Sequence, residues 1–343
     1  MTDALLTEAV DELFTATVTP EVIEAAEASG WADGIWAQVA TMGLPWISVP
    51  EQAGGEGGTL LDALAVLRLA GRHAVPLPLA EAGVLAGWLL AAAGLPIERV
   101  PTTVTADEGL RADGHRVTGV AHRVPWGAAA QRLVVLAGGA VFVFDPAALR
   151  IERHRNLAGE PSDTVHFDHA VPLAVAAAGP GVERTAFWVR AALTRVVLMA
   201  GALRRVSELT TTYVEQRVQF GRPIGRFQAV QQHVVHVGQQ SALLDLAAAQ
   251  AGAIVAAGAD PASARFAVLC AKGVADEAAT IGTRAAHQAH GAMGMTREYP
   301  LHHVTRRLWA WTRQSGTGGQ TAIELGTLAA GAGADGLWPL LAG

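Results

Sequence analysis

Apolar residues recur three and four positions apart over the first 97 residues, which is the spacing of one face of an α-helix. The segments that carry this spacing are VDELF, VIEAAEASGWADGIWAQVATMG and TLLDALAVLRLAGRH. The loop between the last two, VPEQAGGEGG (49–58), must turn sharply because five of its ten residues are Gly or Pro. The pattern predicts an N-terminal helical domain over residues 1–97.

The period changes between residues 98 and 176, where short β-branched runs are separated by Gly, Asp and Pro. These runs are VPTTVTADEG, DGHRVTG, RLVVLAGGAVFVFD and DTVHFDHAVPL. Gly138-Gly139, placed between two apolar runs, is a strong signal for a β-hairpin. We therefore expect a small middle β-domain over residues 98–176.

Helical spacing returns over residues 177–343. One apolar stripe marks a long helix and comprises Val189, Leu193, Val196, Ala200, Leu203 and Val206. Further helices are expected to start near Gln228, Ala262 and Tyr299. The pattern predicts a C-terminal four-helix bundle, so the domain order is helical, β, helical.

Composition excludes several classes of function. The net charge is −6 and the basic residues are scattered, which argues against a nucleic-acid partner. The single cysteine, Cys270, lies in an apolar run and is expected in the core, so no disulfide or cysteine metal site is possible. His287 and His290 share a helix face and His302-His303 follow, but Glu298 is the only acid nearby in the sequence, so we expect no metal.

The N-terminal sequence and the length of the apolar stretches argue for a cytoplasmic protein. The N-terminal sequence MTDALLTEAVDEL has acids where a signal peptide needs a basic region. The longest uncharged apolar stretch, Ala82–Ile97, is shorter than the ~20 residues that span a bilayer and contains Pro96. It therefore predicts a buried helix, and no membrane partner is expected.

Three segments taken together resemble the acyl-CoA dehydrogenase family of flavoproteins. They are VPEQAGGEGGTLLDALAVLRLAGRHAVPLPLAE (49–81), EQRVQFGRPIGRFQAVQQH (215–233) and HQAHGAMGMTREYPLHHVTRRLWAWTRQSGTGGQ (287–320). The resemblance implies an N-terminal helical domain, a middle β-domain, a C-terminal four-helix bundle and FAD at a subunit interface. It also implies α,β-dehydrogenation of an acyl-CoA thioester, in which a carboxylate removes the α-proton and the β-hydrogen leaves as hydride to the flavin.

The resemblance carries over a set of residues that hold the nucleotide part of FAD across the subunit interface. The guanidinium of Arg217 would pair with pyrophosphate through a planar fork of donors. Ala292 replaces the family's second glycine, which is tolerated if its φ is negative. The implied cofactor-binding residues are Arg217, Phe220, Gln228, Gln288, Gly291, Ala292 and Thr317.

The groups that would perform the chemistry are missing. Ser315 precedes Gly316-Thr317 where the family has its catalytic Glu, and a serine hydroxyl is no base near neutral pH. We expect Ser315 to be a helix N-cap or a loop hydroxyl. Some relatives carry the base on the first long helix of the C-terminal domain, but Arg190-Ala191-Ala192 occupy that stretch here. The loops that cover the flavin ring in the family are reduced to 105–109 and 124–127, where Trp126 would stack on the ring or pack between domains.

The residues that would hold the nucleotide are present, whereas the groups that would perform the chemistry are missing. This contrast predicts a non-catalytic subunit of a heterotetrameric (α2β2) acyl-CoA dehydrogenase, of the kind that shortens steroid side chains attached to coenzyme A. A homologous subunit would supply the Glu, and an electron-transferring flavoprotein would accept the electrons by analogy. Two alternatives remain. One is a homodimeric enzyme whose base is Glu208, Glu215 or Asp107, and the other is a protein of the same fold that binds an acyl thioester without redox chemistry.

Overall fold

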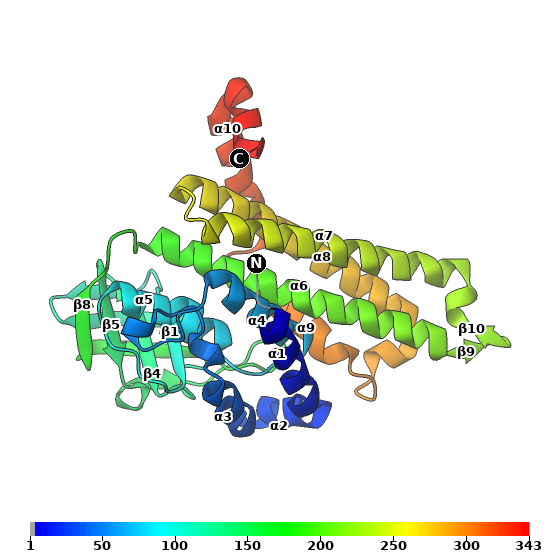
Figure 1. Cartoon of the computed structure of the whole chain (residues 1–343), viewed down its shortest axis with the longest axis horizontal. Coiled ribbons are helices and arrows are strands. Elements are labelled where there is room, and N and C mark those ends of the chain that lie inside the picture. Colours follow the sequence, from blue (N-terminus) through cyan, green and yellow to red (C-terminus); the bar gives the residue numbers. More distant parts are fainter. Residues whose placement is uncertain (1–3, 343) are drawn as a thin grey trace. The chain divides into compact units, whose positions relative to one another are not determined.

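A computed structural model describes residues 4–342, and the side chains of residues 4–338. Helices come first, strands follow between residues 102 and 177, and long helices complete the chain, which confirms the predicted order (Figure 1). Two compact units can be separated. The β-containing unit comprises residues 4–9, 16–66 and 76–191, and the helical unit comprises residues 10–15, 67–75 and 192–342. The proposed domain boundaries at 97 and 176 stay a prediction.

The N-terminal segment is helical as expected. Its elements are α1 (Ala4–Thr17), α2 (Pro20–Ser29), α3 (Asp33–Thr41), the 3₁₀ turns η1 (Leu44–Trp46) and η2 (Glu51–Ala53), α4 (Leu60–Arg72), the π-helix η3 (Ala80–Gly87) and α5 (Trp88–Ala92). In the predicted loop 49–58, a Cβ on Gly55 would lie 2.2 Å from the carbonyl oxygen of Val49. Only glycine allows this approach of two backbone segments.

The apolar stretch Ala82–Ile97 is helical only as far as Ala92. Its first part belongs to η3, all of whose residues are buried, and its second part is α5. The buried helix was correctly predicted, but the π-helical hydrogen bonding was not, because hydropathy does not distinguish a π-helix from an α-helix.

Two four-stranded sheets form the β part. The strands are β1 (Thr102–Thr105), β2 (Arg111–Asp113), β3 (Arg116–Pro125), β4 (Arg132–Ala137), β5 (Ala140–Phe144), β6 (Arg150–Glu152), β7 (Ser162–Ala170) and β8 (Ala174–Ala177), with the short 3₁₀ turn η4 (Pro146–Ala148) between β5 and β6. The sheet orders are β1-β4-β5-β8 and β2-β3-β7-β6, and only the β1–β4 pair is parallel.

Both faces of strand β4 are buried, which explains the continuous apolar run after Arg132 in its sequence, RLVVLA. Leu133 and Val135 pack into the core between the two sheets, together with Phe142 and Phe144 of β5. Val134 packs on the opposite face against the cluster formed with η3 and α5. A strand covered on both faces needs no polar alternation. The predicted hairpin is confirmed, because Gly138 (φ 56°) and Gly139 (φ 77°) join β4 to β5 in the left-handed conformation that such two-residue turns require.

Long helices build the C-terminal part. They are α6 (Arg184–Gln216), α7 (Gln228–Ala256), α8 (Pro261–His290), α9 (Leu301–Trp311) and α10 (Gly318–Ala342), with the short strands β9 (Val218–Gln219) and β10 (Arg222–Pro223) and the 3₁₀ turns η5 (Ile224–Arg226) and η6 (Gly291–Met295) between them. The three predicted helix starts agree with α7, α8 and α9 to within two residues. Every member of the predicted stripe on α6 is buried, at most 6% exposed.

Helix α6 is long and apolar enough to cross a bilayer by composition, and 72% of that segment is buried inside the protein. The core helix of a bundle passes the same test. Cys270 on α8 is only half-buried, so the expectation of a fully enclosed core residue was wrong in degree. Burial nonetheless raises the pKa of its thiol.

Candidate functional site

The loop between α6 and α7 is a two-stranded hairpin that projects beyond the helices (Figure 1). Its turn consists of Phe220 (φ 53°) and Gly221 (φ 78°), both left-handed, which places the Phe220 ring at the tip with 90% of its surface exposed. The guanidinium of Arg222 lies 4.3 Å from the centre of the Phe227 ring. Arg217 is exposed, and its guanidinium has no partner among the described residues.

The second predicted segment lies where α8 ends. Gln288 and Ala292 are exposed, and Gly291 (φ 59°) terminates the helix. A Cβ on Gly291 would meet nothing within 4 Å, so its backbone is open to approach. Ala292 is not among the described residues with positive φ, which meets the condition for alanine at this position.

Three aromatic side chains hold these two segments together. Tyr213, one turn before Arg217, stacks on His290 with ring centres 4.5 Å apart, and its hydroxyl donates to the His290 carbonyl oxygen over 3.3 Å. Tyr299 packs against both rings and donates from its hydroxyl to the carbonyl oxygen of Leu209 over 2.9 Å. The structure therefore brings Arg217 and Gln288 to one end of the helical unit.

The loop at residues 312–320 contains Ser315 (φ 57°) and Gly316 (φ 98°) in consecutive left-handed conformations. Thr317, rather than Ser315, caps α10. The Thr317 amide and hydroxyl donate to Gln320 Oε1 over 2.8 and 3.0 Å, and the Gln320 amide donates back to the Thr317 hydroxyl over 3.4 Å. This reciprocal arrangement is a capping box. Ser315 is thus a loop residue, and the cofactor contact predicted for Thr317 competes with a structural role.

A buried ion pair lies beneath this loop. Lys272 is fully buried, and its ammonium donates to both carboxylate oxygens of Asp276 over 2.7 Å and to the Thr312 carbonyl oxygen over 3.2 Å. Gly318 approaches Asp276 so closely that an added Cβ would lie 3.4 Å from its carboxylate. Sequence inspection missed this pair, although the i, i+4 spacing of opposite charges was visible.

The acids considered as relocated bases have other partners. Glu208 forms ion pairs with Arg72 (3.2 Å), Arg204 (3.3 Å) and Arg205 (3.6 Å). The carboxylate of Asp107 accepts hydrogen bonds from the backbone amides of Gly109 (2.8 Å) and His122 (2.9 Å), which fixes a turn. Both carboxylates are therefore engaged in structural contacts. Glu215 is exposed at the end of α6.

The two family positions for the base hold no carboxylate. Ser315 occupies the first, and the stretch Arg190-Ala191-Ala192 corresponds to the second. The Arg190 guanidinium lies 4.4 Å from the centre of the Trp88 ring. Trp126 is only 5% exposed, in a turn where its carbonyl oxygen accepts from the amides of Ala129 and Ala130. The indole is therefore buried in the folded chain, which favours packing over stacking on a flavin.

Two histidines at the end of α8 bond to neutral groups. His290 Nδ1 lies 2.7 Å from the Ala286 carbonyl oxygen and His287 Nε2 lies 3.2 Å from the Thr305 hydroxyl. Burial lowers the pKa of both rings below the usual histidine value. His290 Nε2 is buried without a hydrogen-bond partner among the described residues. The two rings are thus held neutral.

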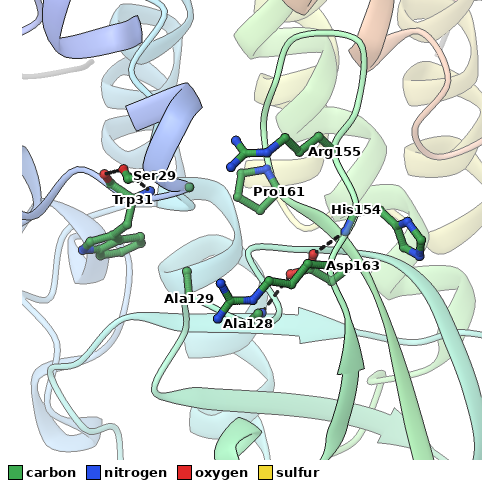
Figure 2. A pocket seen from close by; sticks show the side chains of 10 residues that line it. Ser29, Trp31, Ala128, Ala129, His154, Arg155, Pro161 and Asp163 are labelled. Carbon is green, nitrogen blue, oxygen red and sulfur yellow. Dashed lines mark hydrogen bonds between the residues drawn. The ribbon is translucent and has the colours of Figure 1, made fainter. Parts of the chain in front are cut away.

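A cavity of about 330 Å³ in the β-containing unit was not predicted (Figure 2). Trp31, Pro161, Ala128 and Ala129 line it beside polar groups that are mostly engaged. Asp163 accepts from the amides of Ala128 (2.8 Å) and His154 (3.0 Å). Arg155 donates to the carbonyl oxygens of Glu27, Ala28 and Gly159, the first two of which belong to the last turn of α2. These contacts brace the loop against α2, and sequence spacing gives no signal for them.

The helical, β, helical order and the hairpin site define a flavoprotein of the acyl-CoA dehydrogenase class. The family model of the acyl-CoA dehydrogenase N-terminal domain matches residues 2–96. The family model of the acyl-CoA dehydrogenase C-terminal domain matches residues 185–332. The chain belongs to the acyl-CoA dehydrogenase family. These enzymes are FAD-dependent oxidoreductases, so FAD is the family's cofactor.

Individual relatives narrow the comparison. Acyl-CoA dehydrogenase IpdE2 of Mycobacterium tuberculosis is 30% identical over 314 residues, covering 88% of this chain and 89% of that protein. Acyl-CoA dehydrogenase FadE34 of the same organism is 30% identical and covers 83% of this chain but 40% of its own length. Among solved structures, a chain of the ChsE4-ChsE5 complex from Mycobacterium tuberculosis superposes with a TM-score of 0.86 at 26% identity, covering 96% and 98% of the two chains.

Proposed function

We propose that this chain is the non-catalytic subunit of a heteromeric acyl-CoA dehydrogenase and contributes the adenosine and pyrophosphate half of the FAD site across the subunit interface. The observation that carries the proposal is a contrast between the hairpin end of the helical unit and the family's position for the catalytic base. The hairpin end offers an unpaired Arg217, an exposed Phe220 and an open backbone at Gly291. The position of the family's base, by contrast, holds Ser315, and no acid lies between Glu298 and Glu324.

The residues at the hairpin end fit the nucleotide half of the cofactor. A guanidinium without an acid partner favours a diphosphate, and an exposed ring favours a flat base. Arg217, Gln228 and Gln288 would hold and orient the nucleotide, while Phe220 would pack against it. The bound flavin supplies hydride acceptance, and the proton abstraction falls to a carboxylate of a homologous partner. Glu208 and Asp107 are held in structural contacts, which disfavours these two as relocated bases.

Two solved relatives support a heteromeric assembly on steroid substrates. One is the ChsE4-ChsE5 complex, and the other is described as the Tcur3481-Tcur3483 steroid ACAD, which superposes with a TM-score of 0.86 at 26% identity. We therefore propose a steroid side-chain CoA thioester as substrate, an electron-transferring flavoprotein as acceptor and a cytoplasmic location.

The test is co-purification with a homologous subunit that carries Glu before its Gly-Thr pair. The chain alone should bind little FAD and show no acyl-CoA oxidation, and the complex should be yellow and active. In the complex, Arg217→Ala removes a charge-assisted hydrogen bond worth about 1.5–3 kcal/mol, so FAD affinity should fall roughly 10- to 100-fold. Riboflavin lacks both the pyrophosphate and the adenosine, so its affinity should not change.

Arg116→Ala is the matched control, because Arg116 is an exposed arginine of β3 that donates to the His169 carbonyl oxygen, far along the chain from the hairpin. A yellow homo-oligomer of this chain that turns over acyl-CoA would sink the proposal. Equal losses of FAD and riboflavin binding in Arg217→Ala would sink the assignment of Arg217 to the nucleotide half.

A further inference from the structure

The cavity of Figure 2 is walled by three segments that lie far apart in the sequence. They are the junction of α2 and α3, the turn between β3 and β4, and the loop between β6 and β7, and all three belong to the β-containing unit. Trp31 stands on one side and Pro161 on the other, with Ala129 between and below them in this view. The cavity volume of about 330 Å³ falls within the range of roughly 300–1,000 Å³ that is usual for small-molecule sites.

Hydrogen bonds within the chain hold the walls of this cavity in place. Arg155 bonds the carbonyl oxygens in the last turn of α2 and thereby ties the β6–β7 loop to that helix. The Ser29 hydroxyl donates to the Trp31 carbonyl oxygen over 2.8 Å, and Trp31 Nε1 donates to Asp33 Oδ1 over 2.9 Å. The walls therefore need no ligand to form, and a ligand that enters has little ordering cost to meet.

Arg153 is a lining side chain that stays open to a ligand. Its guanidinium has no partner among the described residues, and the side chain is exposed, so it lies at the mouth of the cavity. Asp163 is 1% exposed, and each of its carboxylate oxygens accepts a backbone amide. The ring of His154 points away from Trp31 (Figure 2). Arg153 and Arg155 bring two positive charges and Asp163 one negative charge, so the lining carries one net positive charge with His154 neutral. This balance favours an anion.

The other lining groups are apolar. The one polar atom of the Trp31 side chain is used on Asp33, so the rest of the indole, the ring of Pro161 and the methyl groups of Ala128 and Ala129 offer only hydrocarbon. Such walls suit a flat ring, because aromatic rings pack on indole with a gain beyond the area they bury. Inorganic phosphate would leave these walls uncovered, and a cation would be repelled by the net charge.

We propose that this cavity binds a small aromatic monocarboxylate, with the ring between Trp31 and Pro161 and the carboxylate at the mouth against Arg153. The planar fork of an arginine matches a carboxylate through two parallel hydrogen bonds. The bound acid bridges α2 and the β6–β7 loop, so its occupancy stabilises the β-containing unit. The site is independent of the proposed nucleotide grip, because no residue of the hairpin lines it and it needs neither flavin nor a partner.

The test uses the full-length chain and compares 2-naphthoate with its uncharged isostere, naphthalene-2-carboxamide, by isothermal titration calorimetry. The acid should bind roughly 3- to 10-fold more tightly than the amide, because an ion pair at the mouth is partly screened by water. Arg153→Met should abolish this preference and leave amide binding unchanged. Arg150→Met is the matched control, because Arg150 is an exposed arginine three residues away that pairs with Glu152 and does not line the cavity. It should bind both compounds like the wild type.

Two further variants test the apolar walls. Ala129→Phe should fill the cavity and abolish binding of both compounds, whereas Ala147→Phe, at an exposed alanine of η4 outside this cavity, should not. Trp31→Leu should weaken both compounds roughly 2- to 10-fold, because it removes the aromatic partner. In the wild type, 2-naphthoate should also raise the thermal midpoint, and Ala129→Phe should lose that rise.

High salt should reduce the preference for the acid and leave amide binding unchanged, because only the ion pair is screened. The proposal is overturned by undetectable binding of 2-naphthoate, by equal affinity for acid and amide, or by an unchanged preference in Arg153→Met. It is equally overturned if inorganic phosphate binds as tightly as 2-naphthoate, or if Ala129→Phe binds like the wild type. None of these outcomes bears on FAD binding by a complex.

Discussion

Replacing Lys272 by methionine should destabilise the helical unit severely, because it breaks a buried ion pair from one side. The methionine keeps most of the apolar stem and removes three hydrogen bonds, two to Asp276 and one to the Thr312 carbonyl oxygen. The Asp276 side chain is only 12% exposed, so its charge would be left without compensation. Breaking such a pair costs about 3–5 kcal/mol, which corresponds to a fall of about 6–20 °C in the thermal midpoint for a unit of this size.

The double variant Lys272→Met/Asp276→Leu provides the discriminating comparison. The double variant leaves no buried charge without a partner, so it should recover most of the stability lost in Lys272→Met. A double-mutant cycle measures the coupling energy between the two side chains. Arg265→Met is the matched control on the same helix, because the Arg265–Glu324 pair is 41% and 30% exposed and should contribute at most about 1 kcal/mol. Urea unfolding followed by circular dichroism measures the wild type, Lys272→Met, Asp276→Leu, the double variant and Arg265→Met.

Lys272 is the only lysine of the chain, so amine acetylation reports its opening without interference from other side chains. The Nζ atom should resist labelling until the unit unfolds. A cost below about 1 kcal/mol for Lys272→Met, or an equal cost for Arg265→Met, would refute the reasoning from burial. Rapid labelling of the native protein would show that the loop at 312–320 is not closed over the pair.

Two further predictions concern the loop and the buried histidines. Ser315→Gly should be neutral or stabilise by up to about 1 kcal/mol, whereas Ser315→Val should destabilise by about 1–2 kcal/mol, because φ is 57° there; equal urea midpoints would contradict this. Burial lowers the pKa of His73, His287 and His290, so each is held neutral in the folded state, and stability is retained above the unfolded value of about 6.5 and lost as pH falls below it. The thermal midpoint should therefore fall between pH 7.5 and 5.5, with a slope of at most about 1.4 kcal/mol per pH unit for each histidine, and His290→Phe should flatten it.

Sequence spacing predicted the elements that follow from a local pattern of apolar residues or glycines. The stripe on α6 and the hairpin at Gly138-Gly139 each follow from a local rule, and both rules hold in the structure. The run RLVVLA predicted a strand but not that β4 is covered on both faces, because covering depends on segments far away in sequence. The π-helical bonding of η3 likewise depends on packing rather than on residue type.

The site was only partly predictable for the same reason. Arg217 and Gln288 could be named from the resemblance, but the Tyr213 contacts that join their segments could not, since they link residues 77 positions apart. The cap of α10 was assigned to Ser315 as one option, and the structure gives it to Thr317 because Gln320 lies three residues on and returns the hydrogen bond. Lys272 was not singled out as a buried cation, because burial of a charge cannot be seen in a local pattern.

The guanidiniums of Arg217 and Arg190 have no hydrogen-bond acceptor among the described residues. Arg217 is exposed, so water satisfies its donors, and a diphosphate is permitted there but not required. Arg190 lies 4.4 Å from the centre of the Trp88 ring, but its side chain is only partly buried and none of its nitrogens is among the described buried atoms that lack a partner, so water reaches its donors as well. An unpartnered arginine therefore marks a ligand site only where other groups point to the same ligand, and at Arg217 the exposed ring of Phe220 and the open backbone at Gly291 do so.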